Sequence, residues 1–171
     1  NIICVTAFRN GYFASGSTDN TIKIWNPSSM GTAVQTLSGH TNDVTVLQQL
    51  SNGLLASGST DTYTIIWNIT TGSQINKFQS VNGEGVTCLK QLATGELVTA
   101  GYDNSIYVWK INGPNSQTLR DTVTNALQYM NPCNDMLLYD SNTLAVASSG
   151  VKTELYNVAN TANVVKIRSL S

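Results

Sequence analysis

Residues 15–26 read SGSTDNTIKIWN, and this stretch decides the fold because it occurs in three versions along the chain. It returns as SGSTDTYTIIWN at residues 57–68 and as TAGYDNSIYVWK at residues 99–110, each time 42 residues further on. All three tryptophans of the protein occupy the same position of this repeat. A period of about 40 residues indicates a fold assembled from repeated supersecondary units.

A fourth copy is weaker. Residues 133–156 align without gaps on residues 86–109, at an offset of 47, which places the five extra residues within 120–132. Apolar residues fall on apolar residues and Tyr156 takes the position of Trp109, but Gly150 stands where the other copies have Asp. The fourth copy therefore keeps the strand pattern and loses the signature.

Each copy carries four strand signals and no helical period. In the second copy these signals lie at 44–47, 54–57, 64–67 and 73–78. Turn dipeptides recur in frame at 10–11, 52–53 and 94–95, each ending in glycine, which accepts the positive φ of a tight hairpin. The three prolines lie between strands. The sequence predicts an all-β fold of antiparallel four-stranded units.

Composition narrows the classes of partner. The 171 residues carry a net charge of −1 and only 11% charged side chains. Sequence-independent nucleic-acid binding needs a basic surface, and so does electrostatic attachment to an anionic membrane. Asn, Ser and Thr form a third of the chain, but 41% hydrophobic residues in short bursts favour a folded β protein over disorder. We expect binding to neither nucleic acid nor membranes.

The cysteines and the N-terminus bear on location. Cys4, Cys88 and Cys133 lack metal-ligand spacing, so we expect reduced thiols in a cytoplasmic protein. Cys4 and Cys88 share one repeat position, aligned with Val46, which predicts small core residues. The glycosylation sequon at 68–70 is then expected to be unused. The apolar N-terminus has no signal-peptide pattern. The chain begins at Asn1 rather than at a methionine, which indicates an excerpt or a processed chain.

These features together resemble the WD-repeat (WD40-type) β-propeller family: the period near 42, four strands per unit, Gly39-His40 before a first strand, and an Asp six residues before each Trp. The resemblance covers the whole chain and is strongest in the first three copies. It implies a propeller of four-stranded antiparallel blades, with four blades in one segment, 1–171. The approximate blade boundaries are 1–40, 41–80, 81–121 and 122–171.

In this family a His, a Ser or Thr, an Asp and a Trp form a structural hydrogen-bond network within one blade. The resemblance assigns this role to His40, Ser57, Asp61 and Trp67 in the second copy. The first copy offers Ser15, Asp19 and Trp25; the third offers Thr99, Asp103 and Trp109, with Asn82 at the His position; the fourth has Tyr129, Val146, Gly150 and Tyr156 and is expected to form no such network.

A catalytic role for His40, Ser57 and Asp61 is the alternative, because a nucleophilic triad uses these residue types. Their repetition in parts, at positions where the family builds a structural network, favours the structural interpretation. The chain has a single histidine and no glycine-rich phosphate loop before a helix. We therefore expect no enzymatic activity, no metal and no cofactor.

The resemblance implies a protein–protein interaction scaffold whose partners bind loops on the top face of the propeller. The loops between fourth and first strands hold Asn1, Asp43, Gly85, Pro132 and Asn134; the loops between second and third strands hold Thr18, Thr60, Tyr102 and Ser149. Tyr102 is the best anchor among them, because aromatic side chains dominate binding hot spots.

The chain starts at the first strand of one blade and ends after the fourth strand of another, so we expect four whole blades. Rings of this family close with about seven blades, and four leave two apolar faces open. We expect two copies to associate around a two-fold axis into an eight-bladed ring. The alternatives are an excerpt of a longer propeller whose effector or enzymatic domain lies outside this chain, or a propeller that binds a small ligand.

Overall fold

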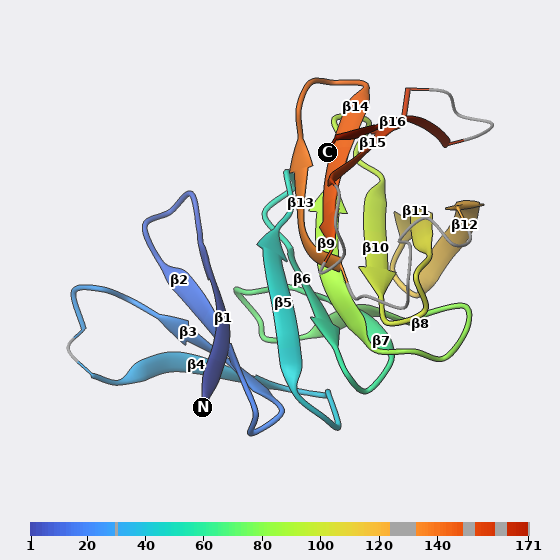
Figure 1. The fold of residues 1–171 in the computed structure, drawn as a ribbon. Coiled ribbons are helices and arrows are strands. Elements are labelled where there is room, and N and C mark those ends of the chain that lie inside the picture. Colours follow the sequence, from blue (N-terminus) through green and yellow to red (C-terminus); the bar gives the residue numbers. More distant parts are fainter. Residues whose placement is uncertain (30, 124–132, 149–152, 160–163, 171) are drawn as a thin grey trace. The chain divides into compact units, whose positions relative to one another are not determined.

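The computed structural model describes residues 1–29, 31–123, 133–148, 153–159 and 164–170, and contains no helix within these ranges (Figure 1). The first eight strands are β1 (Ile2–Ala7), β2 (Phe13–Ser17), β3 (Thr21–Trp25), β4 (Ala33–Ser38), β5 (Val44–Gln49), β6 (Leu55–Ser59), β7 (Tyr63–Trp67) and β8 (Gln74–Gln79). The next eight are β9 (Val86–Gln91), β10 (Leu97–Gly101), β11 (Ile106–Gly113), β12 (Ser116–Val123), β13 (Cys133–Leu138), β14 (Thr143–Ser148), β15 (Thr153–Asn157) and β16 (Val165–Leu170).

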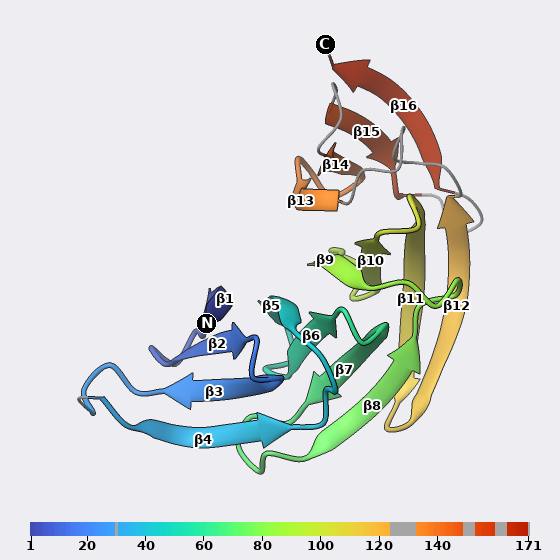
Figure 2. The same cartoon turned by 60° about the horizontal axis from the view of Figure 1, so that its bottom comes forward.

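The strands form four antiparallel sheets, each built from four strands that are consecutive in the sequence (Figure 2). The order within each sheet is the order along the chain, as in a β-meander. The predicted fold class, four-stranded antiparallel blades and four of them in this chain, is confirmed. Each sheet is called a blade below and is numbered from the N-terminus.

The fourth blade preserves the register of the other three. In every blade the pairing of the third and fourth strands shifts directly before the signature Trp position; the shifts lie at Ile24/Trp25, Ile66/Trp67, Val108/Trp109 and Leu155/Tyr156. Such bulges bend a strand and increase its twist. The degenerate copy has therefore kept the backbone geometry of a blade while losing its signature residues.

Two recurring backbone positions explain why the turns repeat. Gly11, Gly53 and Gly95 have φ of 85°, 85° and 91°, as the turn dipeptides predict. Asn20, Thr62 and Asn104, each directly after a signature Asp, have φ of 67°, 77° and 60°. A β-branched residue rarely adopts this left-handed conformation, so Thr62 is held there by its surroundings.

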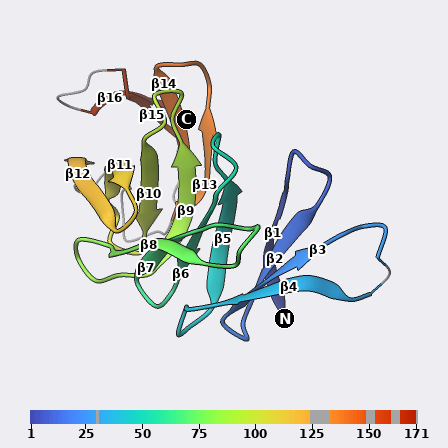
Figure 3. The ribbon, with the colours of Figure 1, turned by 180° about the vertical axis from the view of Figure 1, so that it is seen from behind.

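The chain divides into two compact units, Asn1–Val86 and Thr87–Ser171, and each has its own apolar core. In the first unit, β5 packs beside β1 and β2 (Figure 3), and the core joins side chains of both blades, with Val44 and Leu47 among them. In the second unit the core joins side chains of β9–β11 to side chains of β13–β15. Burial of these apolar faces between neighbouring blades is the main stabilising term in each unit.

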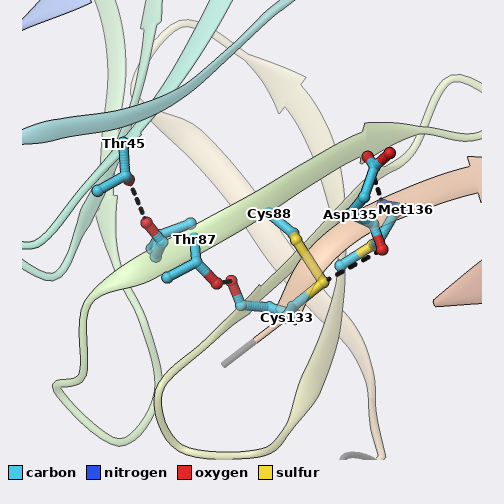
Figure 4. The surroundings of a disulfide bond; sticks show 8 residues. Thr45, Thr87, Cys88, Cys133, Asp135 and Met136 are labelled. Carbon is cyan, nitrogen blue, oxygen red and sulfur yellow. Dashed lines mark hydrogen bonds between the residues drawn. A yellow bond between two sulfur atoms is a disulfide. The ribbon is translucent and has the colours of Figure 1, made fainter. Parts of the chain in front are cut away.

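A disulfide between Cys88 and Cys133 crosses the core of the second unit (Figure 4). It joins β9 to β13, the first strands of two successive blades, over a Cα–Cα distance of 5.9 Å, which is typical of a disulfide. The expectation of three reduced thiols is therefore wrong for these two residues. Both are buried core residues, as predicted for Cys88. Cys4 is the free thiol, and burial raises its pKa to about 11.

Candidate functional site

The second blade contains a continuous chain of hydrogen bonds that links its loops to its strands. Trp67 Nε1 donates to Ser57 Oγ at 2.8 Å, and Ser57 Oγ lies 2.7 Å from His40 Nε2. His40 Nδ1 lies 2.9 Å from Asp61 Oδ2. An ionised carboxylate can only accept, so the His40 Nδ1–H donates to Asp61. The four residues named by the resemblance thus lie in direct contact.

Asp61 is the one carboxylate of this network, and its pKa is strongly lowered. Burial raises its pKa, but hydrogen bonds from the His40 ring and from the backbone N–H groups of Thr41 and Tyr63 outweigh burial and hold the pKa at about 2. The two backbone bonds measure 2.9 Å each. Because three donors converge on one buried carboxylate, the network favours its ionised form.

The Ser57 hydroxyl cannot act as a nucleophile, because it is buried and already hydrogen-bonded. Ser57 Oγ accepts the Trp67 indole N–H and faces the backbone oxygen of Ile65 at 3.3 Å, and Ser57 is fully buried. A catalytic hydroxyl must reach a substrate, so this geometry suits a structural cross-link between loop and strands. A catalytic triad of His40, Ser57 and Asp61 would need a hydroxyl that a substrate can reach, and Ser57 is not accessible.

The first and third blades carry partial versions of the network. Trp25 Nε1 donates to Ser15 Oγ at 2.8 Å, and Trp109 Nε1 donates to Thr99 Oγ1 at 2.9 Å. In the first blade, Asp19 accepts from the hydroxyl and the backbone N–H of Thr21, and these bonds lower its pKa.

In the third blade a tyrosine occupies the place of a missing histidine as the partner of Asp103. The Tyr107 hydroxyl donates to Asp103 Oδ2, and the Ser105 backbone N–H donates to Oδ1 at 3.0 Å. Tyr107 falls on Ile65 of the second blade in repeat frame, and this replacement of an apolar residue by a phenol is the sequence signal that points to it.

The sequence model of the WD domain, G-beta repeat, matches residues 1–26, 31–68 and 72–110, which is more than half of the chain. The chain belongs to the WD-repeat family. Its three matched repeats are the three that carry a Trp bonded to a Ser or Thr. WD-repeat propellers in general serve as protein-interaction scaffolds and are in general not enzymes.

Among solved structures, this WD-repeat chain is similar to the crystal structure of the WD40 beta propeller domain of Doa1, with a TM-score of 0.78 and 23% sequence identity. The match covers 95% of this chain and 52% of that chain, so the WD-repeat segment spans about half the length of the matched propeller. At this identity the likeness shows the fold. A comparison with curated proteins finds none that matches.

The fourth WD-repeat blade replaces the network with a different buried cluster. Val146 and Tyr156, both buried, take the hydroxyl and Trp positions, whereas Tyr129 and Gly150 lie outside the described residues. Burial raises the pKa of Tyr156, and the nearby Glu154 charge adds to this shift. Glu154 is buried, accepts from Ser169 Oγ at 3.0 and 3.1 Å, and lies 2.5 Å from Lys166 Nζ. A single Glu within a strand pattern does not indicate an ion-pair partner, so the sequence analysis did not predict the Glu154–Lys166 pair.

The predicted top-face residues of the first unit lie in two equivalent loop pairs. The Thr18 backbone N–H donates to the Asn1 oxygen at 2.9 Å, and the Thr60 N–H donates to the Asp43 oxygen at 3.0 Å. Thr18 is exposed, whereas Asp43 and Thr60 are half-buried. Gly85 is buried.

The remaining top-face candidates belong to the second unit. Tyr102 lies in the turn between β10 and β11 and is 48% exposed. Asn134 is exposed at the start of β13. Ser149 and Pro132 lie outside the described residues. Within the described part of the chain, no group of three or more His, Cys, Asp and Glu side chains could hold a metal ion. None of the described residues forms a helix long and apolar enough to cross a membrane.

Proposed function

We propose that this WD-repeat chain is a protein-interaction scaffold whose partners bind the loops that hold Thr18, Asp43 and Thr60 in the first unit and the loops that hold Tyr102 and Ser149 in the second. The observation that carries this proposal is Tyr102, an aromatic side chain that is 48% exposed on a turn. The turn is rigid, because Asp103 accepts the Ser105 backbone N–H at 3.0 Å and also the Tyr107 hydroxyl. A rigidly mounted, exposed aromatic ring is the feature most enriched at binding hot spots.

Replacing Tyr102 by Ala is expected to abolish capture of the partner that the wild-type chain retains from an extract, by at least tenfold in recovered protein. An exposed turn side chain contributes little to folding, so the unfolding midpoint should stay unchanged. Affinity capture with quantitative mass spectrometry measures the first effect, and thermal unfolding measures the second. Val165→Ala, which removes an exposed apolar side chain from β16, is the matched control. Equal recovery by both variants would remove Tyr102 from the site.

We also propose that a second copy of the chain covers the open apolar face of the first blade. Val44 and Leu47 of the second blade are buried against the first blade, at 0% and 7% exposure. Their counterparts 42 residues earlier, Ile2 and Val5, are 56% and 65% exposed. The same side-chain positions are therefore covered by a blade in one case and uncovered in the other.

The second unit has a corresponding open position. Leu92 is buried in the core between the third and fourth blades, whereas Tyr139, its counterpart 47 residues later, is exposed. Two open faces with blade-packing residues support closure by two copies into an eight-bladed ring. Blades of a longer chain are the alternative cover, and the 52% coverage of the matched propeller supports that alternative.

The assembly mass decides between these covers. We expect a purified chain at about ten micromolar to have twice its 18.4 kDa mass by light scattering. Val5→Glu should give a monomer, because a charge would be buried in the interface. Val81→Glu, at an exposed position outside the strands, should stay dimeric. A wild-type monomer at this concentration would exclude the two-copy ring.

The cytoplasmic location rested on three reduced thiols, and the Cys88–Cys133 disulfide removes that support. Disulfides persist in oxidising compartments and are rare in the cytoplasm.

A further inference from the structure

A cavity of about 410 Å³ lies in the first unit, at the ends of strands of both blades. Its side chains come from three turns: Arg9 and Asn10 from the turn after β1, Gln49 and Asn52 from the end and turn of β5, and Asn68 and Thr70 from the turn after β7. We call it the donor cavity, because its lining is rich in side chains with N–H hydrogen-bond donors.

The four amide side chains of the donor cavity all use their oxygen to hold a turn. Asn10 Oδ1 accepts from the Tyr12 backbone N–H at 3.1 Å, and Asn52 Oδ1 accepts from the Leu54 N–H at 3.1 Å. Asn68 Oδ1 accepts from the N–H groups of residues 70 and 71 at 2.9 and 3.2 Å. These bonds fix which end of each amide is oxygen, because only an oxygen can accept from a backbone N–H.

Gln49 obeys the same rule across the two blades. Its Oε1 accepts from the backbone N–H of Arg9 at 2.9 Å. With all four amide oxygens engaged, four NH₂ groups are left as donors, and the structure gives none of them a bond to a described residue. An amide NH₂ group carries two protons, so the four amide side chains that line the cavity offer several N–H donors.

Arg9 adds the one charge of the cavity. Its guanidinium donates from Nη1 to the Ser51 backbone oxygen at a long 3.5 Å, and among the described residues no carboxylate forms an ion pair with it. No Asp or Glu lines the cavity. An arginine with several unused N–H donors, lining a cavity together with four amide side chains, is complementary to an anion and above all to a planar carboxylate.

A second cavity of about 420 Å³ shares Asn10, Ile69 and Thr70 with the donor cavity. Ile24 and Val34 contribute apolar surface to it. The two cavities together provide room for a chain segment rather than for a single small ion. A lone arginine balances one negative charge, which fits a carboxylate better than a dianionic phosphate.

We propose that the donor cavity binds a side-chain carboxylate of an acidic peptide segment, with Arg9 as the charged contact and Asn68, Asn52, Asn10 and Gln49 as neutral donors. The residues of this site belong to the first unit and Tyr102 belongs to the second, so the two proposals are tested by separate variants. The cavity contains no group that titrates near neutral pH, so binding should persist until the peptide carboxylates themselves become protonated, below about pH 4.

The test uses a dye-labelled peptide of six glutamates and fluorescence anisotropy on the full chain. Arg9→Gln is expected to weaken binding at least tenfold. Arg168→Gln makes the same charge change at an exposed position of β16 and should leave the dissociation constant within twofold. A peptide of six glutamines should not bind. Equal weakening by both arginine variants would show unspecific charge attraction and overturn the proposal.

Asn68→Asp is the sharpest variant. The new carboxylate keeps an oxygen for the backbone N–H groups of residues 70 and 71, so the unfolding midpoint should not fall, but it replaces an NH₂ donor by a negative charge. Binding should be lost at least tenfold while folding is retained. Wild-type affinity in this variant would overturn the proposal. So would displacement of the peptide by inorganic phosphate but not by free glutamate, because the site would then select phosphate.

Discussion

Reduction of the Cys88–Cys133 disulfide is expected to lower the free energy of unfolding of the second unit by about 4 kcal/mol, which follows from the entropy of closing a loop of this length. The bond closes a loop over a sequence separation of 45 residues. A domain is stable by about 5–15 kcal/mol in total, so the loss would be severe. Urea unfolding of the oxidised and the reduced wild-type chain, followed by circular dichroism, measures the difference.

Two controls make this result specific. Cys4→Ala should unfold like the wild type and keep the full sensitivity to reductant, because Cys4 is the free cysteine. The double variant of Cys88→Ala and Cys133→Ala should unfold at the same low urea concentration with and without reductant. Thiol titration of the unfolded, unreduced chain should find one thiol. Three thiols, or one midpoint for both redox states, would contradict the disulfide.

His40→Ala is expected to lower the free energy of unfolding by about 1–3 kcal/mol, because Asp61 and Ser57 would lose their shared partner inside the protein. Both side chains of the His40–Asp61 pair are nearly inaccessible, at 1% and 2% exposure, so water cannot easily replace the lost bonds. Urea unfolding at pH 7 measures the effect. An unchanged midpoint would mean that the network does not stabilise the blade.

The pH dependence gives an independent measure of the same network. The folded pKa of Asp61 is about 2, below its ordinary value of 3.8, so its contribution is fully present above pH 3.8. That contribution, about 2 kcal/mol for a shift of this size, is lost as the pH falls from about 4 to 2. Asp61→Asn should remove this part of the acid sensitivity. Asp19→Asn, at the equivalent and exposed position of the first blade, should keep it.

The repeat predicted the fold and the main contacts because each blade obeys a local rule. Trp25, Trp67 and Trp109 all donate to the hydroxyl ten residues earlier, in the network that the resemblance to the WD-repeat family implied. By contrast, Tyr107 and Glu154 share one repeat position with Ile65, and each makes a side-chain bond that Ile65 cannot make. A repeat frame averages over copies, so it cannot foresee what a single copy has changed.

The disulfide escaped prediction for a related reason. Cys88 and Cys133 occupy different repeat positions, so aligning the repeats gives no indication that they pair. The first unit shows the same proximity. Cys4 and Val44 occupy the repeat positions of Cys88 and Cys133, and Cys4 Sγ lies 3.4 Å from the Val44 oxygen. First strands of successive blades within a unit bring these positions together. That proximity is a property of blade packing and cannot be inferred from one blade alone.

The sequence by itself determined the number of blades and their strand order. These follow from alternation, turn residues and repeat spacing, all of which act over fewer than 42 residues. Only the tertiary structure decided which cysteines pair, which apolar residues stay exposed, and that four amide side chains line one cavity with Arg9. Such features arise where separate blades meet, and contacts between segments distant in the chain depend on packing rather than on local sequence.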